Sequence, residues 1–352
     1  MASFVHGALA ALARHPDVDV TAYALTFRGR GRLASQVPAG VRAASRPMAA
    51  RLLRASWRRT DHPVIERWTG PVDVAHGTNF VAPPARAAAT VVTVHDLTPV
   101  RFPELSTRDT RQYPGLLARA LRRGAFVHTP SAAVAAEVVE LLGAPADRVV
   151  AVHHGVPPVA GGDPVAGQRL AGAERYILAL GTIEPRKDLP SLLAAFDAVA
   201  ADLPGVRLVV AGPDGWGTAA FEAALARTAH RRRVVRLGWV EDPDRAALLG
   251  GAWAYAYPSL YEGFGFPPLE AMAAGVPVVA TTAGALPEVL GDAALLVAPG
   301  DRDALASALL QLDDGGTRAA LVERGHRRAA AFSWDACAAG LVALYRRAAA
   351  AP

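Results

Sequence analysis

The sequence is poor in cysteine, lysine and aromatic residues, and it has no long apolar run. One cysteine, Cys337, in 352 residues excludes an internal disulfide framework and fits a reducing compartment. The sequence has no run of about eighteen apolar residues, which a membrane-spanning helix requires. Residues 1–20 also lack the basic start of a signal peptide. These absences favour a cytoplasmic protein, with the inner face of the membrane as an option.

Lysine occurs once, at Lys187, although lysine and arginine together number 37. The formal net charge of +5 favours anionic partners, either phosphate-bearing ligands or an anionic membrane surface. A solvated basic surface that reflects the base composition of the gene is the alternative. With 52% hydrophobic and 20% charged residues the chain has a globular composition, and its length fits two domains of about 150 residues each.

Short apolar runs alternate with helical stretches, which predicts two doubly wound α/β units with parallel sheets. Residues 155–172, rich in glycine and proline, predict the linker between them. Three alanine-rich helices are expected at the end, at 301–313, 317–331 and 334–349. The predicted strands are 17–24, 72–77, 89–96, 125–131 and 148–155 in the first unit and 176–182, 206–214, 234–240, 252–259, 276–282 and 293–299 in the second.

The start of the first unit departs from this pattern. A doubly wound unit opens with a strand and a glycine turn, yet residues 3–16 already have a helical pattern. We therefore expect that the first strand is missing, because Met1 was assigned too far downstream or because the chain is truncated. Since each buried unmade hydrogen bond costs about 1–3 kcal/mol, the chain as printed is expected to be poorly soluble or inactive. Equal behaviour with an N-terminal extension would contradict this.

A glycine-rich loop precedes a predicted helix at about 267–274, inside the stretch SLYEGFGFPPLEAMAAGVPVVAT. The amide donors at the start of this helix, with Gly263 and Gly265 allowing close approach of the backbone, suit a phosphate or pyrophosphate. Glu262 and Glu270 frame the loop and carry only acceptor atoms, so we expect them to bind hydroxyl groups on either side of the phosphates. For Glu270 alone, a partner of the helix dipole is an equal alternative.

A second candidate phosphate site lies in LALGTIEPRKDLPSLLAAF, residues 178–196. A predicted strand leads into Gly181 and Thr182, and Arg186 and Lys187 stand just before the next helix. Two adjacent cations can neutralise a diphosphate, the guanidinium as a planar fork and the ammonium as a point charge. An exposed charge pair is the alternative, and the position of the only lysine beside the glycine turn favours the phosphate site.

The two motifs, YEGFGFPPLEAMAAGVPVV and GTIEPRKDL, resemble the retaining, nucleotide-sugar-dependent glycosyltransferases of family 4, and the second resembles their mannosyltransferase-like branch. The resemblance implies a GT-B fold, with an acceptor-side domain at 1–157, a donor-binding domain at 158–333, and a last helix, 334–352, that can pack back on the first. It implies that Arg186 and Lys187 hold the diphosphate, that Glu270 binds the ribose, that Glu262 lies by the transferred sugar, and that backbone near Val240 receives the base. The donor loop it implies also includes Gly181, Thr182, Gly263, Phe264, Gly265 and Phe266.

In the first domain the resemblance places His95, in TVHDLTP, near the donor sugar, with Asp96, Thr78 and Asn79 on the acceptor side. A buried core imidazole is the alternative for His95. Residues 42–68 combine seven arginines with Leu52, Leu53 and Trp57, which suits either a membrane surface or an ordinary solvated helix.

The expected activity is transfer of a hexose, with mannose favoured, from a nucleoside diphosphate such as GDP-mannose to a glycan or lipid-linked saccharide with retention of configuration. The resemblance implies no metal ion or other cofactor, no nucleic acid partner, and a role in surface polysaccharide or glycoconjugate synthesis. A non-catalytic nucleotide-sugar-binding subunit and a sugar-nucleotide epimerase on the same fold are the alternatives.

Overall fold

The computed structural model divides the chain into two units, Met1–Pro157 with Phe332–Pro352, and Pro158–Ala331. Residues 157–161, where the expected domain boundary falls, lie outside the described residues, as do Met1 and two positions of the basic segment, Ser45 and Pro47. The described residues are 2–26, 32–44, 46, 48–105, 110–156 and 162–351.

The second unit is built on a six-stranded parallel sheet in the order β12-β11-β10-β7-β8-β9. All six strands predicted for this unit are present, each a few residues shorter than its apolar run. The chain moves outward from β7 in one direction and then returns to begin again at β10, so the strand order reverses between these two strands. The strands are β7 (Tyr176–Leu180), β8 (Arg207–Ala211), β9 (Val234–Gly238), β10 (Ala254–Tyr257), β11 (Val278–Thr281) and β12 (Ala294–Val297).

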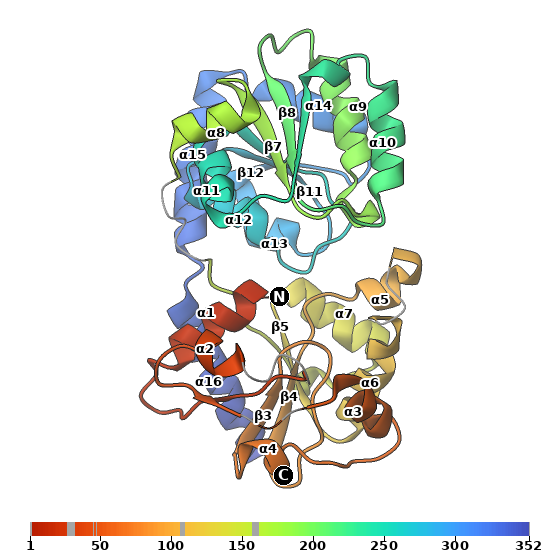
Figure 1. The fold of residues 1–352 in the computed structure, drawn as a ribbon, viewed down its shortest axis with the longest axis vertical. Coiled ribbons are helices and arrows are strands. Elements are labelled where there is room, and N and C mark those ends of the chain that lie inside the picture. Colours follow the sequence, from red (N-terminus) through yellow and green to blue (C-terminus); the bar gives the residue numbers. More distant parts are fainter. Residues whose placement is uncertain are drawn as a thin grey trace. The chain divides into compact units, whose positions relative to one another are not determined.

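Helices cover both faces of this sheet, with α9, α10 and α14 on one side and α8, α11, α12 and α15 on the other (Figure 1). The last helices begin at polar caps: Asp301 and Asp314 each accept a hydrogen bond from a first-turn amide of α14 and α15. The helices are α8 (Pro164–Ala171), α9 (Leu189–Val199), α10 (Thr218–Arg227), α11 (Asp242–Gly251), α12 (Phe266–Ala273), α13 (Leu286–Leu290), α14 (Arg302–Gln311) and α15 (Gly315–Ala330).

The first unit contains a four-stranded parallel sheet in the order β3-β4-β5-β6 and a separate parallel pair, β1 and β2. Four of its predicted strands are confirmed, but the run at 17–24 yields only a two-residue strand, and β2 has no apolar run to predict it. The strands are β1 (Thr21–Ala22), β2 (Arg42–Ala43), β3 (Val74–Gly77), β4 (Ala89–Thr93), β5 (Phe126–Thr129) and β6 (Val149–Ala151).

The last helix, α16 (Trp334–Ala350), belongs to the first unit, where it contacts α1 (Ala2–Leu12) and strands β3, β4 and β5. A Cβ atom on Gly7 of α1 would lie 2.1 Å from the ring of Trp334, so glycine is required for this close packing. The other helices of the unit are α2 (Leu33–Gln36), α3 (Ala50–Trp57), α4 (Glu66–Thr69), α5 (Thr98–Arg101), α6 (Tyr113–Arg122) and α7 (Ala132–Leu142).

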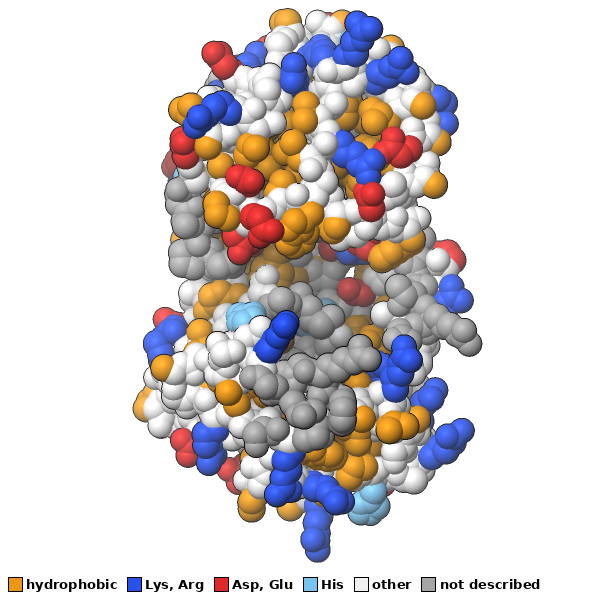
Figure 2. Space-filling view, viewed as in Figure 1, with side chains coloured by type: hydrophobic (Ala, Val, Ile, Leu, Met, Phe, Trp, Pro, Cys, Tyr) orange, Lys and Arg blue, Asp and Glu red, His pale blue; other side chains and the backbone are white. Residues whose placement is uncertain are grey.

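Among the described residues, every helix is too short or too polar to cross a membrane. On the face drawn in Figure 2, arginine and lysine side chains are scattered over both units and interspersed with acidic ones. This distribution fits the solvated basic surface that the composition allows.

Candidate active site

The candidate site of the second unit lies where the strand order reverses. β7 and β10 are neighbours in the sheet, and the two predicted motifs follow directly from their carboxyl ends, at 181–188 and 259–265. Open α/β sheets bind ligands outside the carboxyl ends of their strands at such a switch point. The fold therefore brings together two motifs that are about seventy-five residues apart in the sequence.

Four charged side chains, those of Arg186, Lys187, Glu184 and Glu262, meet at this point. Lys187 Nζ donates to Glu262 Oε1 at 2.7 Å, and Arg186 Nη1 lies 2.7 Å from Glu262 Oε2. Arg186 Nη2 also donates to Glu184 Oε1 at 2.7 Å. The side chains of Arg186, Lys187 and Glu262 are 17%, 13% and 9% exposed, which excludes the exposed charge pair. Two cations and two carboxylates give this cluster a net charge of zero.

That Glu262 would pair with the two cations was not predicted from the sequence. The physical reason for this pairing is that buried cations need a counter-charge, because removing an ion from water without a partner costs several kcal/mol. Burial would raise the pKa of Glu262, but the charges of Lys187 and Arg186 outweigh it and lower that pKa to about 2. Burial lowers the pKa of Lys187, and the charge of Glu262 opposes that effect.

Tyr257, at the end of β10, is a further member of the site that the motifs did not predict. Lys187 Nζ donates to its hydroxyl oxygen at 2.5 Å and lies 4.4 Å from its ring centroid. The ammonium group is thus held by a carboxylate, a hydroxyl and an aromatic face. The position of a tyrosine just ahead of the glycine loop was the only available signal for it.

Backbone hydrogen bonds fasten the two motifs to each other. The amide of Leu260 donates to the carbonyl of Arg186 at 2.8 Å, and Arg186 Nη1 donates to the carbonyl of Tyr261 at 2.8 Å. The carbonyl of Glu262 accepts from the amide of Ala285 at 2.8 Å. A Cβ on Gly284, at φ +55°, would lie 2.2 Å from that carbonyl, so only glycine fits there. The charged cluster is therefore held by backbone contacts as well as by ion pairs.

Glu270 lies in α12 and is paired with Arg245 of α11, a residue that sequence reasoning missed. The carboxylate is 7% exposed and the guanidinium 35% exposed. Burial raises the pKa of Glu270, and Arg245 opposes this. Helix α12 begins within one residue of its predicted start, and Gly265, at φ +111°, supplies the left-handed turn before it.

The remaining predicted donor residues lie in the loops that follow β7, β9 and β10 and in the first turn of α12. Gly181 follows β7 with φ +142°, and its amide donates to the carbonyl of Ala211 at 3.0 Å. Thr182 follows it, and Val240 lies in the loop after β9, next to a largely exposed Trp239. Gly263, Phe264 and Phe266 belong to the loop and the first turn of α12, with the two phenylalanine rings 5.2 Å apart.

The predicted residues of the first unit lie at the carboxyl ends of two neighbouring strands. Thr78 and Asn79 follow β3, and His95 and Asp96 follow shortly after β4. His95 Nε2 donates to the carbonyl of Thr78 at 2.9 Å. Burial lowers the pKa of His95 to about 4, so the ring is neutral at pH 7. Asp96 Oδ1 accepts from the amide of Thr98, the first residue of α5, at 2.8 Å.

A chain of hydrogen bonds fixes the tautomers of two further histidines in this unit. His128 Nε2 lies 3.0 Å from the carbonyl of Val152 and must donate to it, so Nδ1 accepts from the hydroxyl of Thr93 at 2.9 Å. The same hydroxyl oxygen accepts from His76 Nε2 at 2.7 Å, and His76 Nδ1 accepts from the hydroxyl of Tyr345 at 2.7 Å. Burial lowers the pKa of both rings, and each neutral ring then donates through Nε2. Among the described residues, no group of three or more potential ligands gathers for a metal ion.

Comparisons with known proteins bear on the family of this chain. The family described as "Glycosyl transferases group 1" matches residues 174–314, and "Glycosyltransferase Family 4" matches residues 1–159. The O-antigen chain mannosyltransferase B of Escherichia coli is 34% identical over 282 residues, which cover 78% of this chain and 74% of that protein.

Two solved structures share the whole fold. Sucrose-phosphate synthase from Thermosynechococcus elongatus covers 98% of this chain and 92% of its own, with 20% identity and a TM-score of 0.75. Anabaena HepE, solved in complex with UDP and glucose, covers 96% and 94%, with 17% identity and a TM-score of 0.72. The two doubly wound units thus form a GT-B fold, as the motifs implied. The chain belongs to the glycosyltransferases that carry group 1 and family 4 domains.

Proposed function

We propose that this glycosyltransferase moves a hexose, with mannose as the favoured sugar, from a nucleoside diphosphate to a glycan or lipid-linked saccharide with retention of configuration. The observation that carries the proposal is the buried cluster of Arg186, Lys187 and Glu262 at the switch point of the sheet. The similarity to a mannosyltransferase that acts on O-antigen chains supports the choice of sugar and a role in surface polysaccharide synthesis.

The donor diphosphate takes the place of carboxylate oxygens around Arg186 and Lys187. The amides at the start of α12, beside the glycine loop, also donate to the oxygens of the diphosphate. Glu270 accepts hydrogen bonds from the ribose hydroxyls, in place of its ion pair with Arg245 or in addition to it. Backbone near Val240 receives the base. GDP is the favoured nucleotide. Glu262 then lies beside the transferred sugar, within reach of its hydroxyl groups.

The bond between the anomeric carbon and the phosphate oxygen breaks as the acceptor oxygen bonds to the same face of that carbon. The proton of the acceptor hydroxyl passes to the departing phosphate, whose charge Arg186 and Lys187 stabilise. We assign no side chain as the catalytic base. In the first unit, His95 is neutral and donates to the carbonyl of Thr78, so its role there is that of a hydrogen-bonding group rather than a charged acid.

The test is a transfer assay with GDP-mannose and a short mannoside acceptor, run on the chain and on a form that carries the extra N-terminal strand predicted from the sequence. We expect release of GDP, an α-linked product from the α-linked donor by NMR, and unchanged rates in EDTA because the proposed chemistry uses no metal. UDP-glucose serves as the competing donor. Epimerised donor, or donor binding without any release of nucleotide by either form, would contradict the proposal.

We further propose peripheral contact with an anionic membrane through the basic segment 42–68. In α3, Leu53 and Trp57 are buried in the core, whereas Leu52 is 74% exposed and Arg58 and Arg59 are exposed beside it. The contact is therefore mainly electrostatic, worth about 1 kcal/mol per arginine at a surface and screened by salt.

Co-sedimentation with anionic phospholipid vesicles tests this contact. We expect binding at low salt that falls in Arg58→Glu/Arg59→Glu and disappears at about 0.5 M salt, where the Debye length is only several ångströms. The matched control is Arg231→Glu/Arg232→Glu, an exposed pair in the other unit. Equal losses in both double variants, or binding that persists at high salt, would refute an electrostatic contact through this segment.

A further inference from the structure

Tyr257 is the last residue of β10, and its ring is held by two contacts. The residue is 3% exposed, and its ring stacks on that of Tyr255 with the two centroids 6.1 Å apart. Because residues two apart in a strand point to the same face of the sheet, β10 itself places these rings together. The ammonium group of Lys187 lies 4.4 Å from the centroid of the Tyr257 ring. The position of the hydroxyl group is therefore fixed by the packing of its ring.

The hydroxyl group of Tyr257 contacts two charged groups. Its oxygen accepts a hydrogen bond from Lys187 Nζ at 2.5 Å, and its O–H donates to the carboxylate of Glu262, which can only accept. Burial and the charge of Glu262 raise the pKa of Tyr257 well above its ordinary value, so the hydroxyl group is neutral at pH 7. Since Lys187 Nζ also donates to Glu262 Oε1 at 2.7 Å, the three side chains form a closed set of hydrogen bonds.

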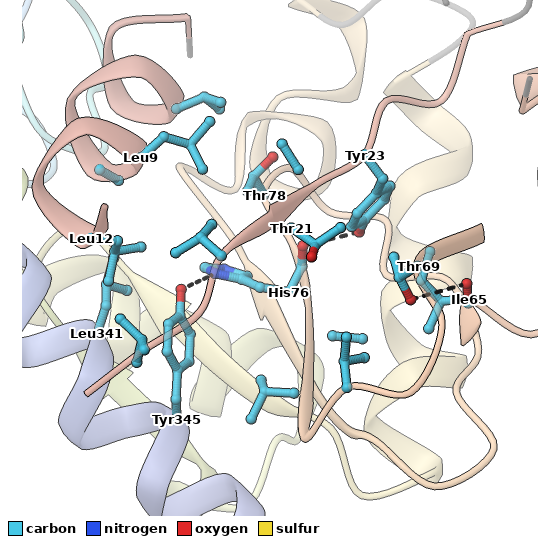
Figure 3. Close-up of a pocket in the computed structure, with 18 of the residues that line it drawn as sticks. Leu9, Leu12, Thr21, Tyr23, Ile65, Thr69, His76, Thr78, Leu341 and Tyr345 are labelled. Carbon is cyan, nitrogen blue, oxygen red and sulfur yellow. Dashed lines mark hydrogen bonds between the residues drawn. The ribbon is translucent and has the colours of Figure 1, made fainter. Parts of the chain in front are cut away.

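Two tyrosines of the first unit provide a comparison. Tyr23 and Tyr345 line a cavity of about 880 Å³, to which residues of β1, β2 and β3 contribute (Figure 3). The hydroxyl of Tyr345 donates to His76 Nδ1 at 2.7 Å, and that of Tyr23 donates to the carbonyl of His76 at 2.9 Å. Both acceptors are neutral, and a buried tyrosine hydroxyl usually has such a partner. Tyr257 differs because its hydroxyl group joins a cation to an anion.

The two cations of the site have different second partners. Arg186 donates to Glu184 as well as to Glu262, and each of these carboxylates offsets part of its charge. For Lys187 the second partner is Tyr257, and a neutral hydroxyl group fixes the ammonium group without offsetting its charge. Among the described residues, the ammonium group has these two hydrogen-bond acceptors, the carboxylate and the hydroxyl. When the carboxylate gives up the ammonium group, the hydroxyl group still holds it, and its full charge is available to a ligand.

We propose that Tyr257 is a positioning residue for the exchange of Lys187 from Glu262 to the donor diphosphate. This inference rests on the proposed function, in which the diphosphate takes the place of the carboxylate. During the exchange, the hydroxyl oxygen of Tyr257 keeps its hydrogen bond from Lys187, and its O–H keeps donating to Glu262. The ammonium group thus stays in place, and the buried carboxylate keeps a donor, whose loss would leave it unsatisfied.

Tyr257→Phe tests this role because it keeps the ring and removes only the hydroxyl group. We expect kcat/KM for GDP-mannose, measured with the active form of the chain, to fall about tenfold, the order expected for one hydrogen bond to a charged group. The matched control is Tyr255→Phe, which removes a buried hydroxyl group from the same face of the same strand. This control should leave kcat/KM unchanged.

A double-mutant cycle separates positioning from a merely structural effect. Because the hydroxyl group acts through the ammonium group, we expect Tyr257→Phe to have no further effect on kcat/KM in a chain that already carries Lys187→Ala. A hydroxyl group that only stabilised the fold would lower kcat/KM by the same factor in both backgrounds. Equal factors would therefore overturn the proposal.

The single lysine of the chain allows the ammonium group to be observed directly. In protein labelled with isotopic lysine, one set of NMR signals reports Lys187 before and after the addition of GDP. We expect GDP to shift these signals in the native chain. In the GDP complex of Tyr257→Phe, the hydrogens on Nζ should exchange with water at least about fivefold faster than in the native complex, because one of their acceptors is gone.

The two ways in which this experiment can fail are distinguishable. Equal exchange rates in the two GDP complexes would overturn the role of Tyr257 and leave the diphosphate site intact. Signals of Lys187 that GDP does not shift would contradict the diphosphate site of the proposed function, and with it the exchange that Tyr257 is proposed to support.

Discussion

Replacing Lys187 by alanine is expected to lower the rate of sugar transfer by about 30- to 1,000-fold, corresponding to about 2–4 kcal/mol of transition-state stabilisation. The ammonium group is the chain's only lysine and is held at the carboxyl end of β7 by Glu262 and Tyr257. In the proposed mechanism it is thus preorganised where charge develops on the departing diphosphate. The measurement is kcat/KM for the donor, made with whichever of the two forms of the transfer assay, the chain itself or the N-terminally extended chain, is active.

The fold is expected to tolerate this change, since Glu262 keeps Arg186 as its partner. The control is Arg327→Ala, which removes an exposed cation paired with Glu323 in the same unit and should leave kcat/KM unchanged. Full turnover by the Lys187 variant with an intact fold would show that the diphosphate is bound elsewhere.

Replacing Glu262 by glutamine is expected to destabilise the protein by about 3–5 kcal/mol, because two buried cations lose their shared carboxylate. That is a large part of a typical total stability of about 5–15 kcal/mol, so urea unfolding measures it directly. The double variant Glu262→Gln/Lys187→Met should regain much of the loss, since Arg186 retains Glu184. If the double variant does not regain stability, the loss of unfolding free energy in Glu262→Gln does not come from unpaired charge.

The pH dependence follows from the same carboxylate. Its pKa in the folded protein, about 2, is below the ordinary value of 4.5. The stability it contributes is therefore present above pH 4.5 and is lost as the pH falls towards 2. We expect the difference in unfolding free energy between the native protein and Glu262→Gln to narrow across that window and to be constant from pH 5 to 8.

Local patterns in the sequence were sufficient for most of the elements. The six strands of the second unit and the three last helices were predicted because apolar runs and alanine-rich helical spacing are local properties. The prediction of a strand at 17–24 was only partly correct, and β2 was not predicted. Both strands lie beside the cavity, where pairing with a neighbour, rather than the residues themselves, decides how far a strand extends.

The site was predicted as motifs but not as contacts. The spacing around the glycine loop indicated Glu262 and Glu270, yet their partners depend on which strands become neighbours in the sheet. Arg245 lies 25 residues from Glu270, in an ordinary-looking helix, and Tyr257 lies 70 residues from Lys187. No local pattern distinguishes Arg245 from the other arginines of the chain, and only its position ahead of the glycine loop marks Tyr257.

In the proposed function, the carboxylate of Glu262 competes with the donor diphosphate for Arg186 and Lys187. A diphosphate gains Arg186 and Lys187 only by taking N–H donors from a carboxylate that already holds them at 2.7 Å. The apparent binding free energy of the diphosphate is therefore less favourable than the intrinsic one, by the free energy needed to break the ion pairs of Glu262. Small anions such as inorganic phosphate bring no sugar or base contacts to offset this exchange, so we expect them to bind more weakly than the proposed donor.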